Sequence, residues 1–142
     1  MKISDALLKQ IERHGEADFP REACGLLVGT SDTIAEAVPS RNLAASENEF
    51  LIDPALQLKL QRELRGTGRR IVGVYHSHPS GDSAPSDADK TWARAAGLVW
   101  LITPVADGRA GVSRLFSGAS GESGGFNKNF IEQRLQTEKK VA

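Results

Sequence analysis

The sequence predicts an α+β fold, an α/β sandwich built around a mixed β-sheet, and three observations lead to this prediction. The chain has 142 residues, a length that fits one domain with one core. Its composition, 39% hydrophobic and 25% charged, is that of an ordinary globular protein. Short apolar segments of strand type alternate with helical segments, so neighbouring strands can pair in a sheet that the helices cover.

Three segments carry the signals of helices, and each starts at a residue that can cap a helix N-terminus. Ser4 or Asp5 can cap the first, whose apolar residues Ile3, Leu7, Leu8 and Ile11 recur at helical spacing. Asp53 can cap the second and is followed by proline, which is favoured at the first helical position. Ser86 begins the third. The three helices are expected to end at Gly15, at Gly66 and at about Ala96.

The strongest strand signal is the apolar segment 71–75, which runs directly into His76-Ser77-His78-Pro79. Pro104 is expected to end a later apolar strand, and residues 107–109 form a turn. The other predicted strands are 24–29, 33–38, 50–52, 98–102 and 111–116.

The last part of the chain differs in composition from the rest. The predicted domain comprises residues 1–116, and residues 117–125 are rich in glycine and serine, as in a flexible linker. In the tail, Phe130, Ile131 and Leu135 form a weak helical face. The sequence leaves open whether this polar tail is disordered, packs on the domain or docks on a second copy in a homodimer.

Charge and cysteine content exclude several classes of protein. Lysine plus arginine number 18 and aspartate plus glutamate number 18, so the formal net charge is zero. Proteins that bind nucleic acid usually carry a basic excess, so no such partner is expected. Cys24 is the only cysteine, which excludes an intrachain disulfide and a zinc site of several cysteines. Any metal site must therefore use histidine, aspartate and glutamate.

The N-terminal segment predicts neither secretion nor membrane insertion. Its charged residues recur at Lys2, Asp5 and Lys9, with no apolar run of signal-peptide length. No segment approaches the roughly 18 apolar residues of a membrane span. We therefore expect a cytoplasmic protein without a membrane partner.

The segment from His76 to Asp89 predicts a metal site. His76 and His78 share one face of a strand, because side chains alternate between faces. The chain then loops back to the helix that Ser86 starts, which brings Asp89 near the two imidazoles. Three protein ligands leave a fourth position for water, as in catalytic zinc sites. The donor set suits Zn²⁺, although Fe²⁺ and Mn²⁺ also accept it.

A hydrolytic site also needs a proton acceptor and a group that stabilises an oxyanion. Glu22 directly precedes the apolar strand segment 23–28 and can act as general base toward the water that a zinc ion activates. Ser86 can offer its hydroxyl to the oxyanion. Each residue also has a plainer interpretation: Ser86-x-x-Asp89 is a helix-capping pattern, and Glu22 alone would be a solvated strand end. Two histidines at this spacing also occur by chance.

These residues together resemble the JAMM motif: His-x-His, seven residues, Ser, two residues, Asp. That motif marks the metal-dependent branch of the JAB1/MPN (Mov34) family, called MPN+, and residues 21–29 resemble the strand that follows the family's catalytic Glu. The resemblance covers about residues 3–116. It implies the cytidine-deaminase-like JAB1/MPN fold, a curved mixed sheet flanked by helices. It also implies that His76, His78 and Asp89 bind one zinc ion, that Glu22 is the base, and that Ser86 stabilises the oxyanion.

The resemblance is to the small single-domain prokaryotic members of the family. It implies hydrolysis of a peptide or isopeptide bond after the C-terminal glycine of a ubiquitin-like or sulfur-carrier protein with a Gly-Gly tail. Two alternatives stay open: a non-catalytic module that binds such tails, and a metal-dependent hydrolase of small peptides. The sequence does not identify the substrate.

Overall fold

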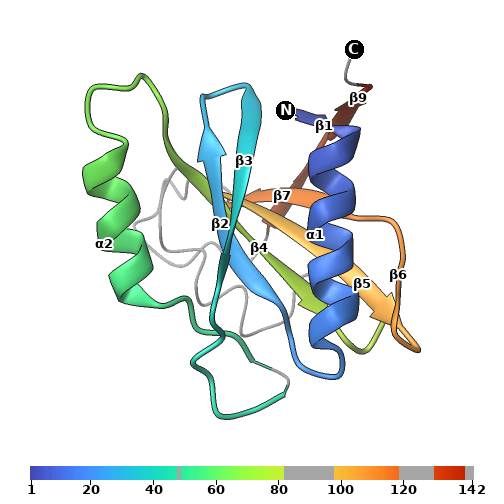
Figure 1. Cartoon of the computed structure of the whole chain (residues 1–142). Helices are drawn as coiled ribbons and strands as arrows, with labels where there is room; N and C mark the ends of the chain where they lie inside the picture. Colours follow the sequence, from blue (N-terminus) through green and yellow to red (C-terminus); the bar gives the residue numbers. More distant parts are fainter. Residues whose placement is uncertain (48, 82–97, 119–129, 140–142) are drawn as a thin grey trace, which may run out of the picture.

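A computed structural model describes residues 1–47, 49–81, 98–118 and 130–139 of the chain. In these ranges the chain forms the nine-stranded mixed sheet and two helices drawn in Figure 1. The helices are α1 (Asp5–Asp18) and α2 (Pro54–Glu63). The strands are β1 (Lys2–Ser4), β2 (Cys24–Gly29), β3 (Thr33–Ser40), β4 (Arg70–His78), β5 (Val99–Ala106), β6 (Arg109–Ala110), β7 (Arg114–Gly118), β8 (Phe130–Gln133) and β9 (Gln136–Glu138).

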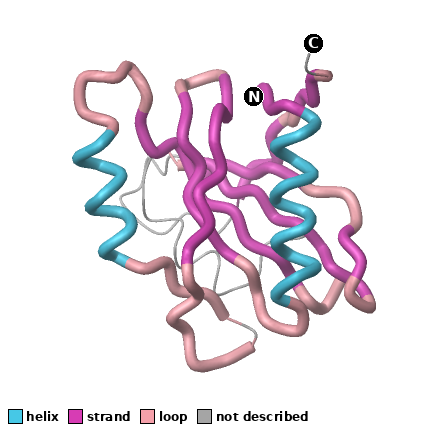
Figure 2. The backbone as a smooth tube through the Cα atoms, in the orientation of Figure 1, coloured by secondary structure: helices cyan, strands magenta, loops and turns pink. Residues whose placement is uncertain are grey.

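The strand order places β4 in the middle of the sheet. The order is β8-β7-β5-β4-β2-β3-β1-β9, with β6 paired to β5. Strand β4 runs antiparallel to β2 and parallel to β5, so the sheet is mixed. Figure 2 shows the two helices flanking this curved set of strands. Of the described helices, neither is long and apolar enough to cross a membrane. The predicted α+β class is confirmed.

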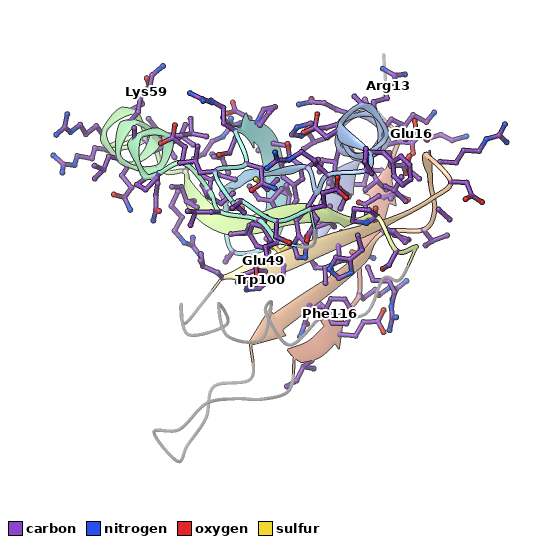
Figure 3. All side chains as sticks on the ribbon, turned by 90° about the horizontal axis from the view of Figure 1, so that it is seen from below. Arg13, Glu16, Glu49, Lys59, Trp100 and Phe116 are labelled. Carbon is purple, nitrogen blue, oxygen red and sulfur yellow. The ribbon has the colours of Figure 1, made fainter. Side chains whose placement is uncertain are left out.

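Two apolar clusters fill the space on the two faces of the sheet. Neighbouring residues of β2 fall into different clusters, as the alternation of side chains along a strand requires. In Figure 3, Trp100 and Phe116 lie on the side of the strands away from α1, whose Arg13 and Glu16 are labelled. The α1 cluster is Ile3, Leu7, Ile11, Leu27, Ile34, Ala37, Val72, Tyr75, Leu101 and Leu115. The Trp100 cluster is Cys24, Leu26, Val28, Phe50, Ile52, Leu60, Val74, Trp100, Ile102 and Phe116.

The first helix begins at the predicted cap but ends later than predicted. The side chain of Ser4 caps it by accepting from the Leu7 amide at 3.1 Å, but Ile3 belongs to β1 and pairs with β3. Ile3 and Leu7 are buried in the same cluster, which explains why both are apolar although only Leu7 lies in the helix. The predicted end at Gly15 is wrong, since α1 continues to Asp18. A Cβ at position 15 would lie 3.1 Å from the Cβ of Ser77, so Gly15 serves close packing rather than helix termination.

Three strand predictions also need correction. Strand β5 continues through Pro104 to Ala106, and the carbonyl of Pro104 accepts from the Gly111 amide at 2.7 Å, a contact that needs no proline N–H. The segment 50–52 makes only an isolated bridge, between Ile52 and Asn42. The predicted strand 111–116 begins only at Arg114 and extends to Gly118.

The helical interpretation of the tail is wrong in the part that the structure describes. Residues 130–133 form β8, which pairs with β7, and residues 136–138 form β9, which pairs in parallel with β1. The edges of the sheet offer backbone partners to this segment, and this pairing overrides a weak local helical pattern. The linker residues 119–125 lie outside the described residues.

Gly25 in β2 is expected to accept a side chain only with a loss of stability. A Cβ there would lie 2.2 Å from Cε2 of Tyr75 and 2.5 Å from the carbonyl oxygen of Val38. Tyr75 is buried and cannot move aside, because its hydroxyl lies 2.7 Å from Nδ1 of His14. We therefore expect Gly25→Ala to lower the free energy of unfolding by roughly 1–3 kcal/mol in denaturant titration. Gly111→Ala is the control, because its nearest neighbour is a side-chain atom of Pro104 at 3.1 Å; an equal loss there would contradict the argument.

Candidate functional site

The two histidines of the motif lie together at the end of the central strand β4. The sheet register pairs His76 with Cys24 of β2 and His78 with Pro104 of β5. Both side chains are buried, at 0% and 7% exposure, and their Nε2 atoms lie 3.0 Å apart. The predicted placement of both imidazoles on one face of one strand is what the structure shows.

Glu22 joins this pair because of strand direction. Since β2 runs antiparallel to β4, the start of β2 lies beside the end of β4. The Glu22 side chain is 4% exposed, and one carboxylate oxygen and one nitrogen from each of His76 and His78 lie within 4.8 Å of one another. The structure therefore brings together three of the five residues that the motif predicts.

The other two lie outside the described residues. Ser86 and Asp89, with the helix that was expected to carry them, fall in the segment 82–97. Their proposed roles thus stay predictions from the motif.

Two aromatic rings fix the orientation of His76. Phe50 stacks on the imidazole at a centroid distance of 4.4 Å and an interplanar angle of 20°. Trp100 of β5 meets it edge-on at 6.1 Å. The sequence predicts Phe50 only as the start of a strand, 50–52, and gives no sign that its ring would pack on His76. Its position three residues before Asp53, the N-cap of α2, was the only clue to where it would lie.

The donor set fits a divalent metal ion of the zinc type. Imidazole nitrogens and a carboxylate oxygen are ligands that zinc accepts, at about 2.0–2.2 Å from the ion. Two such nitrogens at a tetrahedral angle would be about 3.3 Å apart. The observed 3.0 Å separation in His76 and His78 is within a few tenths of an ångström of that value. Burial also removes water from the Glu22 carboxylate, and a metal cation beside it would compensate for this lost hydration.

The third histidine takes no part in this cluster. His14 lies in α1, where Nδ1 is 2.7 Å from the Tyr75 hydroxyl and Nε2 is 3.2 Å from a carboxylate oxygen of Asp18. The His14 side chain is 18% exposed, and its contact with Tyr75 links α1 to β4.

Cys24 is buried beside the cluster and has the character of an inert core residue. Burial, followed by the charge of Glu22, raises the pKa of its thiol to about 12. Only roughly one thiol in 10⁴ would then be ionised at pH 8. Cys24 is therefore a small buried hydrophobe rather than a nucleophile.

We expect Cys24 to be unreactive in the folded protein. At pH 8, a chromogenic disulfide reagent is expected to modify less than a tenth of the thiol in the time that gives complete reaction in denaturant. The denatured protein is the control for reagent quality. Rapid stoichiometric reaction of the native protein, with loss of the activity proposed below, would contradict the assignment.

Comparison with known proteins gives the family. Residues 4–116 match the model of the prokaryotic homologs of the JAB domain. The chain is 36% identical over 101 residues to a desampylase of Haloferax volcanii, covering 69% of this chain and 73% of the relative. It is 32% identical over 111 residues to a probable TtuB-protein conjugate cleaving protease of Thermus thermophilus, covering 78% and 71%. It is 33% identical over 85 residues to a CysO-cysteine peptidase of Mycobacterium tuberculosis, covering 58% of each.

Solved structures agree on the fold. The solution structure of a Desulfitobacterium hafniense protein superposes with a TM-score of 0.81 at 26% identity, covering 99% of this chain and 94% of that one. The crystal structure of a JAB1/MPN domain protein from Archaeoglobus fulgidus gives a TM-score of 0.61 at 23% identity, covering 97% and 96%. The second likeness shows the JAB1/MPN fold alone. With the family match over 4–116 and the buried Glu22–His76–His78 cluster, the chain belongs to the prokaryotic JAB family, as a small JAMM/MPN peptidase.

Proposed function

We propose that this peptidase hydrolyses the peptide or isopeptide bond after the C-terminal glycine of a ubiquitin-like or sulfur-carrier protein, with one zinc ion in its site. The observation that carries the proposal is the buried cluster of Glu22, His76 and His78. The names of the relatives support it, because they describe a desampylase, a conjugate-cleaving protease and a CysO-cysteine peptidase. The Gly-Gly tail of the substrate and the cytoplasmic location are part of the proposal.

The proposed roles follow from the chemistry of each group. His76, His78 and Asp89 would hold the zinc ion, which supplies a water of lowered pKa and polarises the scissile carbonyl. Glu22 accepts a proton from the attacking water and passes it to the leaving amine. Ser86 donates its hydroxyl to the oxyanion that forms at the carbonyl.

The way in which an extended Gly-Gly tail would bind also supports the proposal. An extended tail can bind by main-chain hydrogen bonds along a strand, which requires no charge of either sign on the enzyme. The zero net charge of the chain is compatible with this mode of binding. Two glycines carry no side chain, so they allow the tail to approach a buried site closely.

A cleavage assay on a defined conjugate tests the proposal. The substrate is a ubiquitin-like carrier whose Gly-Gly tail is joined either to cysteine or to the ε-amine of a lysine peptide, and the zinc-loaded protein is expected to release the carrier. A carrier ending in two alanines is the control and should be cleaved much more slowly. Binding of the carrier without cleavage would favour the non-catalytic module, and equal cleavage of short free peptides would favour the small-peptide hydrolase.

A further inference from the structure

The peptide group that joins Glu22 to Ala23 is held at both ends by side chains. Its carbonyl oxygen accepts a hydrogen bond from Nδ2 of Asn42 at 3.0 Å. Its amide donates to the hydroxyl oxygen of Ser77 at 2.8 Å, in a buried contact. The two side chains come from different segments, one from the loop after β3 and one from the strand β4. Together they fix the plane of the peptide group immediately after the Glu22 side chain.

The hydrogen bond from the Ala23 amide to the Ser77 hydroxyl lies where the regular ladder between β2 and β4 ends. In an antiparallel hydrogen-bonded pair, two residues exchange two main-chain bonds. Here the Ser77 amide donates to the carbonyl of Ala23 at 2.9 Å, but the Ala23 amide donates to the Ser77 hydroxyl. A side chain thus takes the place of a main-chain acceptor at the residue that follows Glu22.

Ser77 reaches this position from the face of the sheet opposite the two histidines. It lies between His76 and His78 in β4, so its side chain points the other way. A Cβ on Gly15 of α1 would be 3.1 Å from the Cβ of Ser77, which places this side chain against the helix. The hydroxyl is therefore remote from the face where a substrate would meet the imidazoles, and it can act only through the backbone.

Asn42 is itself fixed by the loop that it organises. Its Oδ1 accepts from the amides of Ala44 and Leu51 at 2.9 and 3.0 Å, and its Nδ2 also donates to the carbonyl of Glu49 at 2.9 Å. With the oxygen end bound to two amides, the nitrogen end must point to the Glu22 carbonyl. The same loop carries Phe50, which stacks on His76. One amide side chain thus ties the backbone of Glu22 to the segment that orients a histidine.

We propose that Asn42 and Ser77 are positioning residues, which hold the Glu22–Ala23 peptide group so that the Glu22 carboxylate stays in place beside His76 and His78. The inference rests on the proposed function, in which Glu22 is the general base. A general base must lie within about 2.6–3.2 Å of the proton that it takes. A misplacement of about 1 Å can cost roughly 100-fold in rate.

Two conservative variants remove the side-chain hydrogen bonds to the Glu22–Ala23 peptide group. Asn42→Asp keeps the Oδ1 acceptor for Ala44 and Leu51 but loses the Nδ2 donor to the carbonyls of Glu22 and Glu49. Ser77→Ala loses the hydroxyl acceptor and keeps the main-chain bond to Ala23. We expect each to lower kcat on the Gly-Gly conjugate by roughly 10- to 100-fold, with KM changed less than about threefold. Ser77→Thr, which restores the hydroxyl, should recover most of the kcat that Ser77→Ala loses.

Gln10→Glu is the matched control for Asn42→Asp. Gln10 of α1 also donates an amide hydrogen bond to a backbone carbonyl, that of Ala37 at 3.1 Å, and the substitution also adds one negative charge. It does not touch Glu22, so kcat should stay within about twofold of the unsubstituted protein. An equal loss of kcat in Gln10→Glu would show that general destabilisation explains the result and would overturn the proposal.

The decisive measurement repeats both substitutions in a Glu22→Gln background. If Asn42 and Ser77 act through Glu22, they should cause no further loss of single-turnover rate once the base is gone. The same fold-loss in both backgrounds would overturn the proposal. All variants are compared at equal zinc content and at a temperature where each is folded by circular dichroism.

A readout without activity separates this inference from the proposed function. In Ser77→Ala the Ala23 amide should exchange with deuterium at least about tenfold faster, while the Leu27 amide in the middle of β2 keeps its protection. Unchanged protection of Ala23 would overturn the proposal even in an active enzyme. If the unsubstituted protein cleaves no conjugate but Ala23 loses protection as expected, the proposed function fails and the hydrogen bond to the backbone of Glu22 stands.

Discussion

Replacing Glu22 by glutamine is expected to abolish most of the conjugate cleavage and to leave the fold intact. The substitution keeps the size of a side chain that is only 4% exposed but removes its ability to take a proton. General acid–base catalysis contributes typically 10²- to 10⁴-fold, so we expect kcat to fall by roughly that factor. The measurement is the initial rate of carrier release, together with metal content and the unfolding midpoint.

Glu36→Gln is the matched control for this result. Glu36 lies on β3 at the surface, where its carboxylate is 3.3 Å from Arg69, and its replacement should leave the rate within about twofold.

The metal content of Glu22→Gln distinguishes a general base from a metal ligand, since the Glu22 carboxylate lies within 4.8 Å of both imidazole donors. A base can be replaced without loss of zinc, whereas a ligand cannot. Full activity in Glu22→Gln would refute the proposed mechanism.

Local sequence patterns were sufficient to predict the histidine pair and its strand. The apolar segment before His76 gives a buried strand, and the alternation of side chains then puts His76 and His78 on one face. Neither pattern says what lies next to that face. Glu22 is 54 residues earlier in the chain, and its approach depends on the antiparallel pairing of β2 with β4. The sequence proposes Glu22 as the base from its place at the start of a strand and from the resemblance to the JAMM family, but the contact with the histidines follows only from this pairing.

The parts of the fold that could not be predicted depend on contacts between distant segments. Gly15 looks like the end of a helix, but its role is set by Ser77, with which it packs. The tail segment has no strong local preference and forms strands because β7 and β1 offer it open edges. Asn42 lies in a polar stretch without periodicity, and its importance follows only from the Glu22 carbonyl that it reaches.

Removing the metal is expected to lower the stability of the protein in proportion to how tightly the folded site binds it. A ligand that binds only the folded state stabilises it by about 2.7 kcal/mol when its free concentration is 100 times Kd. For a domain of this size, that corresponds to roughly 7–10 °C in Tm. We therefore expect a chelator to lower Tm by this amount, and added zinc to restore it.

His78→Ala tests whether this effect belongs to the proposed site. His78 is the better choice because His76 is stacked under Phe50, so His76→Ala would also leave a cavity in the core. The variant loses a ligand, so the difference in Tm with and without chelator should fall to less than about 2 °C. The substitution also lowers Tm directly, and for this reason the readout is the difference and not Tm itself.

His14→Ala is the control that makes the comparison decisive. It removes a partly buried histidine that contacts Tyr75 and Asp18 on the α1 side of the sheet. Its Tm should fall because a buried hydroxyl loses its partner, but its response to chelator should equal that of the unsubstituted protein. If both variants kept the full response, the metal would bind elsewhere. If neither the unsubstituted protein nor His14→Ala responded, the cluster at the end of β4 would not hold a metal, because mass action requires a shift wherever the folded state binds one.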